Sequence, residues 1–227
     1  MKENKRLVEA IVGALVFISF LWCIKSAEIL FSLNLTSLGL TPHSVFGLLG
    51  IITAPLIHGS LQHLFNNTLA ILILGSVLYY GYPKSWIKVV TLIWLLSGIG
   101  VWLFAREANH IGASGLTHGA FFFLFVVSLF RRDKSSVGIM MIAFLMYGGM
   151  TMSIFPREEA ISYEYHFFGA LAGVLAAFIW KGLDPKPVEK KYDWEDEHED
   201  GNDEMSEFAD LPMTKSNENP PINRTLH

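Results

Sequence analysis

The chain has 227 residues, of which 52% are hydrophobic, and its mean hydropathy is +0.39. This composition argues against a soluble globular domain and favours a membrane protein with several spans. The net charge of −4 is the sum of a basic part and an acidic part of the chain. The chain has no basic patch interleaved with aromatic residues, so we expect no nucleic-acid partner.

Six apolar runs divide the first 183 residues, each about long enough to cross a ~30 Å hydrocarbon layer at ~1.5 Å per residue. They cover residues 7–24, 64–82, 86–105, 113–130, 137–155 and 164–180. The sequence therefore predicts an all-α polytopic membrane protein with six transmembrane helices.

The basic residues lie mostly on one side of the membrane in this six-helix arrangement. They cluster before the first run, after the second, fourth and sixth, and are balanced by glutamates in the other connections. Because positively charged loops remain in the cytoplasm, we expect both termini to be cytoplasmic in a multi-pass protein of a bacterial inner (plasma) membrane.

The two parts of the chain differ in charge. Residues 1–183 hold twelve Lys and Arg against eight Asp and Glu, whereas residues 184–227 hold five against thirteen and few large apolar residues. Such a segment cannot bury enough apolar surface to fold. We expect a membrane domain at 1–183 and an acidic disordered cytoplasmic tail at 184–227. A solvated tail is favoured over a docking or turnover segment.

The connection between the first two helices, residues 25–62, is the other unusual segment. It is too apolar for a solvated loop, yet glycines and prolines break it into pieces that are too short to span. The sequence therefore predicts a long membrane-associated loop that lies in the interface or against the bundle.

Polar residues inside the spans are functional candidates because lipid makes them costly. His63 and Asn67 are four residues apart, so they share one face of the second helix. Ser114 begins the fourth helix and His166 begins the sixth. Alternating topology would bring all four to a similar depth below the same membrane surface.

Two glycine pairs with GxxxG spacing follow these residues: Gly115 with Gly119, and Gly169 with Gly173. Such pairs are commonplace in membrane helices, but they allow two helix backbones to approach closely. We expect this approach to bring the His166 imidazole within hydrogen-bond reach of the Ser114 oxygen.

Three motifs occur in order on these spans. They are His58-Gly-Ser-Leu-Gln-His63-Leu-Phe-Asn-Asn67, Gly112-Ala-Ser114-Gly115 and His166-Phe-Phe-Gly169-Ala-Leu-Ala-Gly173. With them, roughly residues 10–180 resemble the rhomboid family of intramembrane serine proteases. The resemblance implies a rhomboid-like bundle that cleaves transmembrane protein substrates in the lipid bilayer without cofactor or metal. It leaves the oligomeric state open.

The resemblance also implies roles for individual residues. Ser114 would be the nucleophile, His166 the general base and acid, and His63 and Asn67 would donate to the oxyanion with the Ser114 backbone N–H. Supporting positions would be Gly112, Gly115, His118, Gly169 and Gly173.

General chemistry is compatible with these roles. A serine hydroxyl is a poor nucleophile until an imidazole takes its proton, and each oxyanion donor is typically worth ~3 kcal/mol in the barrier. No acidic third member is obvious. Glu164 lies two residues before His166, so we expect a loop carboxylate and not a group that orients the imidazole.

The chain departs from the family at two places. Many rhomboids carry a Trp-Arg pair in the first long loop, which is missing here, so His43 or Phe46 could anchor that loop instead. The position four after the serine is often Tyr, and here it is His118. This ring could stack on His166, hydrogen-bond to it, or rival it as the base, and we expect stacking.

Access and substrate choice can also be anticipated. We expect gating by the fifth helix, which holds Gly148 and Gly149, and by the loop 156–165. Substrates would have one span with helix-weakening residues and a small residue before the cut. Two other classes stay open, a catalytically inactive rhomboid-like binder of membrane helices and a haem or metal carrier using His63, His118 and His166.

Overall fold

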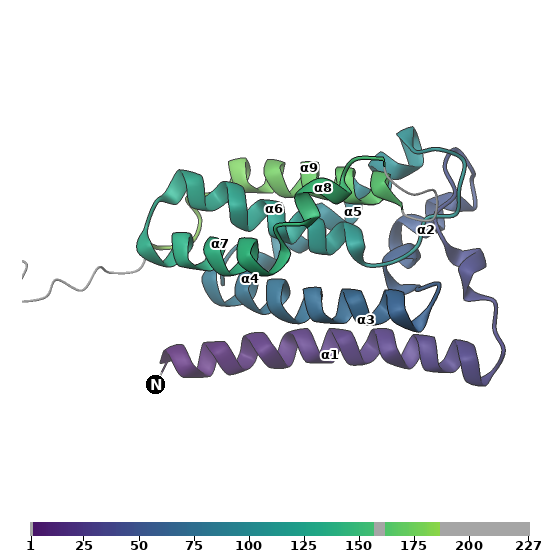
Figure 1. The fold of residues 1–227 in the computed structure, drawn as a ribbon, viewed down its shortest axis with the longest axis horizontal. Helices are drawn as coiled ribbons and strands as arrows, with labels where there is room; N and C mark the ends of the chain where they lie inside the picture. Colours follow the sequence, from purple (N-terminus) through teal and green to yellow (C-terminus); the bar gives the residue numbers. More distant parts are fainter. Residues whose placement is uncertain (1, 157–161, 187–227) are drawn as a thin grey trace, which may run out of the picture. The chain divides into compact units, whose positions relative to one another are not determined.

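The computed structural model describes residues 2–156 and 162–186, and within these ranges it contains helices and one isolated bridge between Leu40 and His110, with no strand. The α-helices are α1 (Lys2–Leu30), α2 (Gly47–Thr53), α3 (Leu61–Ala70), α4 (Ser76–Gly81), α5 (Trp86–Phe104), α6 (Ser114–Arg131), α7 (Lys134–Tyr147), α8 (Met150–Ser153) and α9 (Tyr163–Trp180) (Figure 1). Shorter helical turns are Leu35–Leu38, Ala54–Leu56 and a π-helical turn at Ile71–Gly75.

Four helical segments of the described chain are long and apolar enough to cross a membrane. They are Asn4–Leu30, Leu61–Gly81, Trp86–Phe104 and Ser114–Arg131, and the second joins α3, the π-helical turn and α4. The helix α9 has 18 residues but begins with a polar turn, and α7 has 14 residues. The protein is an all-helical membrane bundle, as the composition predicts.

The predicted fifth helix at 137–155 is wrong as a continuous element. The helix α7 ends at Tyr147, and the short α8 begins at Met150. The break falls at Gly148 and Gly149, and two successive glycines weaken a helix because they lose more backbone entropy than other residues and have no side chain to pack. The short helix α8 is therefore separate from α7 and can pack over the bundle in a position of its own.

The first helix is longer than predicted, because α1 continues past Lys25 to Leu30. The Lys25 ammonium is buried, pairs with the Glu28 carboxylate at 2.8 Å and donates to the His58 carbonyl at 2.8 Å. The Glu28 carboxylate thus neutralises the Lys25 ammonium inside the structure, so helix α1 can continue past this charged residue.

The helices α6 and α9 approach each other closely along their glycine pairs. A Cβ atom at Gly169 would collide with the carbonyl oxygen of Gly115, and one at Gly173 would collide with that of Gly119. The close approach predicted from the GxxxG spacing is confirmed. It places the first turn of α9 beside the first turn of α6, where Ser114 lies.

The connection between α1 and α3 folds against α5, as expected for an apolar segment that does not span. The Trp94 indole N–H donates to the Ile51 carbonyl at 3.1 Å, and that of Trp102 donates to the Ser44 carbonyl at 2.9 Å. His43 Nε2 bonds the Leu103 carbonyl at 2.9 Å, whereas Phe46 is 91% exposed. Of the two anchors suggested by the sequence, His43 thus contacts α5, whereas Phe46 has no such contact in the described part of the chain and its role stays a prediction.

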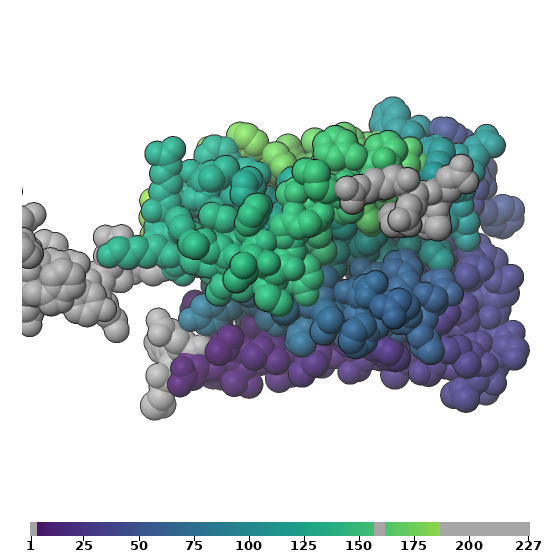
Figure 2. Space-filling view, in the orientation of Figure 1, coloured from purple at the N-terminus to yellow at the C-terminus, as the bar shows by residue number. Residues whose placement is uncertain are grey.

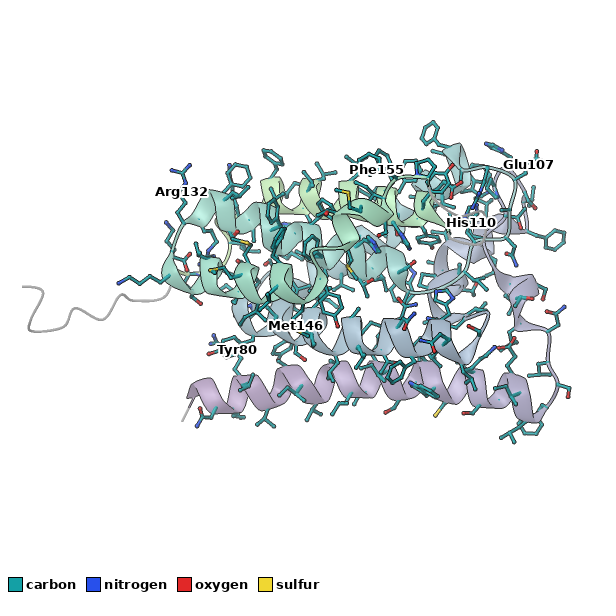
Figure 3. The ribbon with its side chains drawn as sticks, viewed as in Figure 1. Tyr80, Glu107, His110, Arg132, Met146 and Phe155 are labelled. Carbon is teal, nitrogen blue, oxygen red and sulfur yellow. The ribbon has the colours of Figure 1, made fainter. Side chains whose placement is uncertain are left out.

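The two ends of the bundle differ. The N-terminus of α1 and the labelled Tyr80 and Arg132 lie at one end, which we call the basic end, while Glu107 and His110 lie at the other, the site end (Figures 1 and 3). At the basic end Asp184 is buried and accepts from the Lys84 N–H at 2.6 Å. The sequence assigned Asp184 to the tail, and residues 187–227 lie outside the described residues, so the tail boundary stays a prediction.

Candidate active site

Residues from α3, α6, α8 and α9 meet in a polar recess of about 1050 Å³ at the site end. We call it the site recess. It lies between α3 and the α7–α8 segment, which border each other on the face in Figure 2. The polar residues that line it include Ser60, His63, Asn66, Asn67, Arg106, His110, Ser114, His118, Ser162 and His166. The four residues that the sequence placed at one depth thus share one cavity.

Ser114 is the first residue of α6 and follows a tight turn. Gly112 has φ +108°, a conformation that L side chains rarely adopt, and its N–H donates to the Ala54 carbonyl at 2.9 Å. A Cβ atom there would lie 2.5 Å from the His63 ring. Gly112 therefore allows the turn before the serine to pack against His63. The Ser114 hydroxyl makes no hydrogen bond to the described part of the chain, so the hydrogen bond to the His166 imidazole expected from the sequence is not formed in this structure.

The imidazoles of His118 and His166 stack face to face. Their ring centroids are 3.9 Å apart and their planes differ by 8°. Stacking is the arrangement expected from the sequence for His118. Both side chains are largely buried, with 4% and 8% of their residues' surface exposed.

Each of these two rings is also held by hydrogen bonds. His118 Nδ1 bonds the Ser114 carbonyl at 2.7 Å, and its Nε2 bonds Ser153 Oγ at 2.7 Å. His166 Nδ1 bonds the Ser153 carbonyl at 3.0 Å. Because a carbonyl oxygen only accepts, His166 carries a proton on Nδ1, and in the neutral ring Nε2 is then an unprotonated base.

The two candidate oxyanion donors lie one turn apart on α3. Ser60 caps this helix by accepting from the His63 N–H at 3.0 Å. One Asn67 amide hydrogen goes to the His63 carbonyl at 3.3 Å, which leaves a second one. The His63 ring nitrogens make no hydrogen bond to residues 2–156 or 162–186. Both residues thus keep N–H groups available at the site recess.

His58 supports this arrangement from the loop before α3. Its Nε2 accepts from the Ala113 N–H at 3.4 Å, and its ring meets the His63 ring edge to face at 5.1 Å. Burial, together with the neighbouring His63 and Lys25, lowers the pKa of His58 to about 4. The neutral ring can therefore accept, and His58 connects the loop before α3 to the turn before α6.

Glu164 does not orient the His166 imidazole. It lies in the first turn of α9, not in a loop, and is buried with its carboxylate 3.1 Å from Arg106 Nε. His110, to which the sequence analysis gave no role, joins this region because its Nδ1 bonds Ser162 Oγ at 2.6 Å. Burial lowers the pKa of His110.

Metal binding by the histidines finds little geometric support. In the described ranges no three His, Cys, Asp or Glu side chains are grouped so that they could hold an ion. Both ring nitrogens of His118 bond protein atoms, so that ring offers no lone pair to a metal.

Known proteins resemble this chain over most of its length. A model of the Rhomboid domain family matches residues 45–182, from the loop before α2 to the end of α9. The chain belongs to the rhomboid family. Uncharacterized proteins of Mycobacterium tuberculosis and Mycobacterium bovis are each 33% identical over 174 residues, which is 73% of this chain and 72% of theirs. An uncharacterized protein of Mycobacterium leprae is 31% identical over 190 residues, 78% of this chain and 75% of its own.

The family match covers the whole candidate site of this rhomboid. His63, Asn67, Ser114, His118 and His166 all lie inside the matched residues, whereas α1 precedes them. The unusual histidine at position 118 is therefore a feature within the family core of the protein.

Proposed function

We propose that this rhomboid is an intramembrane serine endopeptidase that cleaves single-span membrane proteins with Ser114 as nucleophile. The observation that carries the proposal is the joint placement of the Ser114 hydroxyl and the His166 ring in one polar recess, where neither Ser114 Oγ nor His166 Nε2 has a hydrogen-bond partner among residues 2–156 and 162–186. These are the two groups that acyl transfer needs.

In this mechanism Ser114 Oγ attacks the substrate carbonyl carbon while its proton passes to His166 Nε2. The tetrahedral intermediate collapses when the C–N bond breaks, and the proton on Nε2 goes to the leaving amine. Water then attacks the acyl ester. His166 takes its proton and returns it to Ser114 Oγ, which restores both groups.

The oxyanion is stabilised by His63, Asn67 and the Ser114 backbone N–H. Each donor contributes ~3 kcal/mol to the barrier when it is aimed at the developing charge. The first-turn N–H groups of α6 have no partner inside that helix, which makes the Ser114 end a favourable place for a negative oxygen. The turn at Gly112 keeps His63 next to this end.

Substrate helices reach the recess between α3 and the α7–α8 segment. Because a carbonyl in an intact helix is hydrogen-bonded, a substrate segment must unwind before attack. We therefore expect substrates with Gly, Pro or polar residues in the span and a small residue before the cut. The break at Gly148 and Gly149 gives the α7–α8 segment a place to move.

The orientation follows from charge. The basic end carries Arg131, Arg132 and Lys134, so it would face the cytoplasm with both termini, and cleavage would occur near the outer face. The mycobacterial relatives favour a bacterial plasma membrane. Residues 1–183 would form the protease domain, with 184–227 as an acidic cytoplasmic tail.

The test is activity in proteoliposomes with a single-span substrate, together with labelling by a fluorophosphonate. Wild-type protein should cleave and be labelled, whereas Ser114→Ala and His166→Ala should do neither. Ser128→Ala is the matched control because Ser128 lies at the other end of the same helix and donates to the Phe125 carbonyl. Substrate binding by wild type without labelling would identify a catalytically inactive binder instead.

A further inference from the structure

Ser153, the last residue of α8, contacts both stacked histidines through different atoms. Its side-chain Oγ lies 2.7 Å from His118 Nε2, and its backbone carbonyl lies 3.0 Å from His166 Nδ1. Ser153 thus contacts the candidate base, His166, through its backbone carbonyl. It contacts the stacked ring of His118 through its hydroxyl. No sequence motif points to Ser153, because it lies in none of the three segments that resemble the family.

The hydrogen-bond inventory fixes the direction of these contacts. His118 Nδ1 must donate to the Ser114 carbonyl, so in the neutral ring His118 Nε2 accepts from the Ser153 hydroxyl. The same hydroxyl lies 3.0 Å from the Met150 carbonyl, which is a longer alternative acceptor. His118, Ser153 and His166 therefore form a closed set of two hydrogen bonds and one ring contact, to which Ser114 is joined through His118.

This set of contacts orients the base, a role that a carboxylate usually has in a serine hydrolase. A third group must hold the base in one tautomer and stabilise the imidazolium that forms. The Glu164 carboxylate lies 3.1 Å from Arg106 Nε, and within residues 2–156 and 162–186 it makes no hydrogen bond to the His166 ring. A backbone carbonyl is a suitable acceptor for the Nδ1–H group, and the carbonyl of Ser153 occupies that place.

We propose that Ser153 is the positioning residue for His166, and that α8 carries it so that the base is set only when α8 lies over the site. The inference rests on the proposed protease function and deepens it. Since Ser153 follows the break at Gly148 and Gly149, displacement of α8 removes the bonds to both histidines together. Access of substrate and activation of the base are thereby coupled to the same short helix.

The first test separates positioning from folding. Ser153→Ala removes the hydroxyl bond to His118 and should lower kcat about tenfold, the equivalent of one net hydrogen bond, with KM nearly unchanged. Ser153→Thr keeps a hydroxyl and should recover most of the loss. Thr151→Ala is the matched control, because Thr151 lies on the same helix and, among the residues that the structure describes, its hydroxyl donates to the Gly148 carbonyl and not to a histidine. Equal effects of Ser153→Ala and Thr151→Ala would overturn the proposal.

A double-mutant cycle tests the path through His118. His118→Phe keeps a flat ring but removes both nitrogens, so Ser153→Ala should cost much less in that background than in wild type. Equal costs in the two backgrounds would mean that the hydroxyl does not act through His118.

Histidine tautomers provide a measurement that does not depend on cleavage. Nitrogen NMR of the 15N-histidine protein should show His166 protonated on Nδ1 in wild type, in Ser114→Ala and in Ser153→Ala, which keeps the backbone carbonyl. The His118 Nε2 resonance should shift in Ser153→Ala, because that nitrogen loses its hydroxyl donor. A wild-type ring protonated on Nε2 would overturn the proposal. An inactive wild type with the expected tautomer would instead contradict the protease function alone.

Discussion

The imidazole of His118 lies flat on that of His166, with ring centroids 3.9 Å apart and an angle of 8° between their planes. His118 cannot also act as the base in this arrangement, because its two nitrogens bond the Ser114 carbonyl and Ser153 Oγ. The His118 ring instead packs against one face of the His166 imidazole and, through its bond to Ser153 Oγ, connects that imidazole to α8.

His118→Tyr should therefore retain a substantial part of the activity, whereas His118→Ala should lose more. A tyrosine ring preserves the stacked contact, and alanine leaves a cavity beside the base and a free Ser153 hydroxyl. The rate of fluorophosphonate labelling measures this. If His118→Tyr labelled as poorly as Ser114→Ala while His166→Ala remained active, His118 would be the base and the assignment would be reversed.

Gly112→Ala should reduce labelling strongly and also destabilise the protein. A residue with a Cβ at φ +108° is strained by about 1–2 kcal/mol, and this Cβ would press on the His63 ring. The His63 N–H would then move from the oxyanion position. Thermal unfolding and labelling of the same samples give both effects.

Gly138→Ala is the control for this substitution. Gly138 is a helical glycine of α7, and nothing lies within 4 Å of the Cβ that alanine would add. It should unfold at the wild-type temperature or above, since alanine favours helix by about 1 kcal/mol. Similar losses in both variants would show that the Gly112 turn has no special role.

The sequence predicted the parts of the site that repeat a local pattern. Glycine spacing foretold the approach of α6 to α9, and turn-by-turn spacing put His63 and Asn67 on one face. Ser153 and the Lys25 contact with His58 could not be foreseen, because they join segments whose separation depends on how the helices pack. The end of α7 was missed because the length of the apolar run outweighed the glycine pair inside it.

Stability should fall as the pH is lowered from about 6.5 toward 4, and His58 should cause part of this loss. The pKa of His58 is lowered to about 4 by burial and by the nearby His63 and Lys25. Between these pH values the unfolded chain binds a proton that the folded chain does not, so unfolding is favoured by up to about 3 kcal/mol. Burial lowers the pKa of His110 in the same direction.

Thermal unfolding at pH 7.5 and pH 5 in one detergent measures this loss. Wild type should melt at a lower temperature at pH 5, and His58→Gln should show a smaller difference between the two values. The Asp133 carboxyl does not interfere, because its pKa is lowered from 3.8 and it titrates below this window. If His58→Gln showed the same difference in melting temperature between pH 7.5 and pH 5 as wild type, His58 would not be a cause of the pH dependence.

Shortening the chain should reveal where the membrane domain ends. Asp184 accepts from the Lys84 N–H and the Ser85 hydroxyl, while its backbone carbonyl accepts from Arg131 Nη1 at 2.9 Å. A chain that stops after residue 187 keeps these contacts and should melt like the full chain. A chain that stops after Leu183 leaves the buried Arg131 guanidinium without two of its acceptors, the carbonyls of Asp184 and Pro185, and an unsatisfied buried donor costs about 1–3 kcal/mol. Asp184→Asn in the full chain should give part of that loss, because an amide can accept from only one of the two donors. Equal melting of the two shortened chains would place the domain boundary at 184, as the charge distribution alone suggests, and would mean that the Asp184 contacts add nothing to stability.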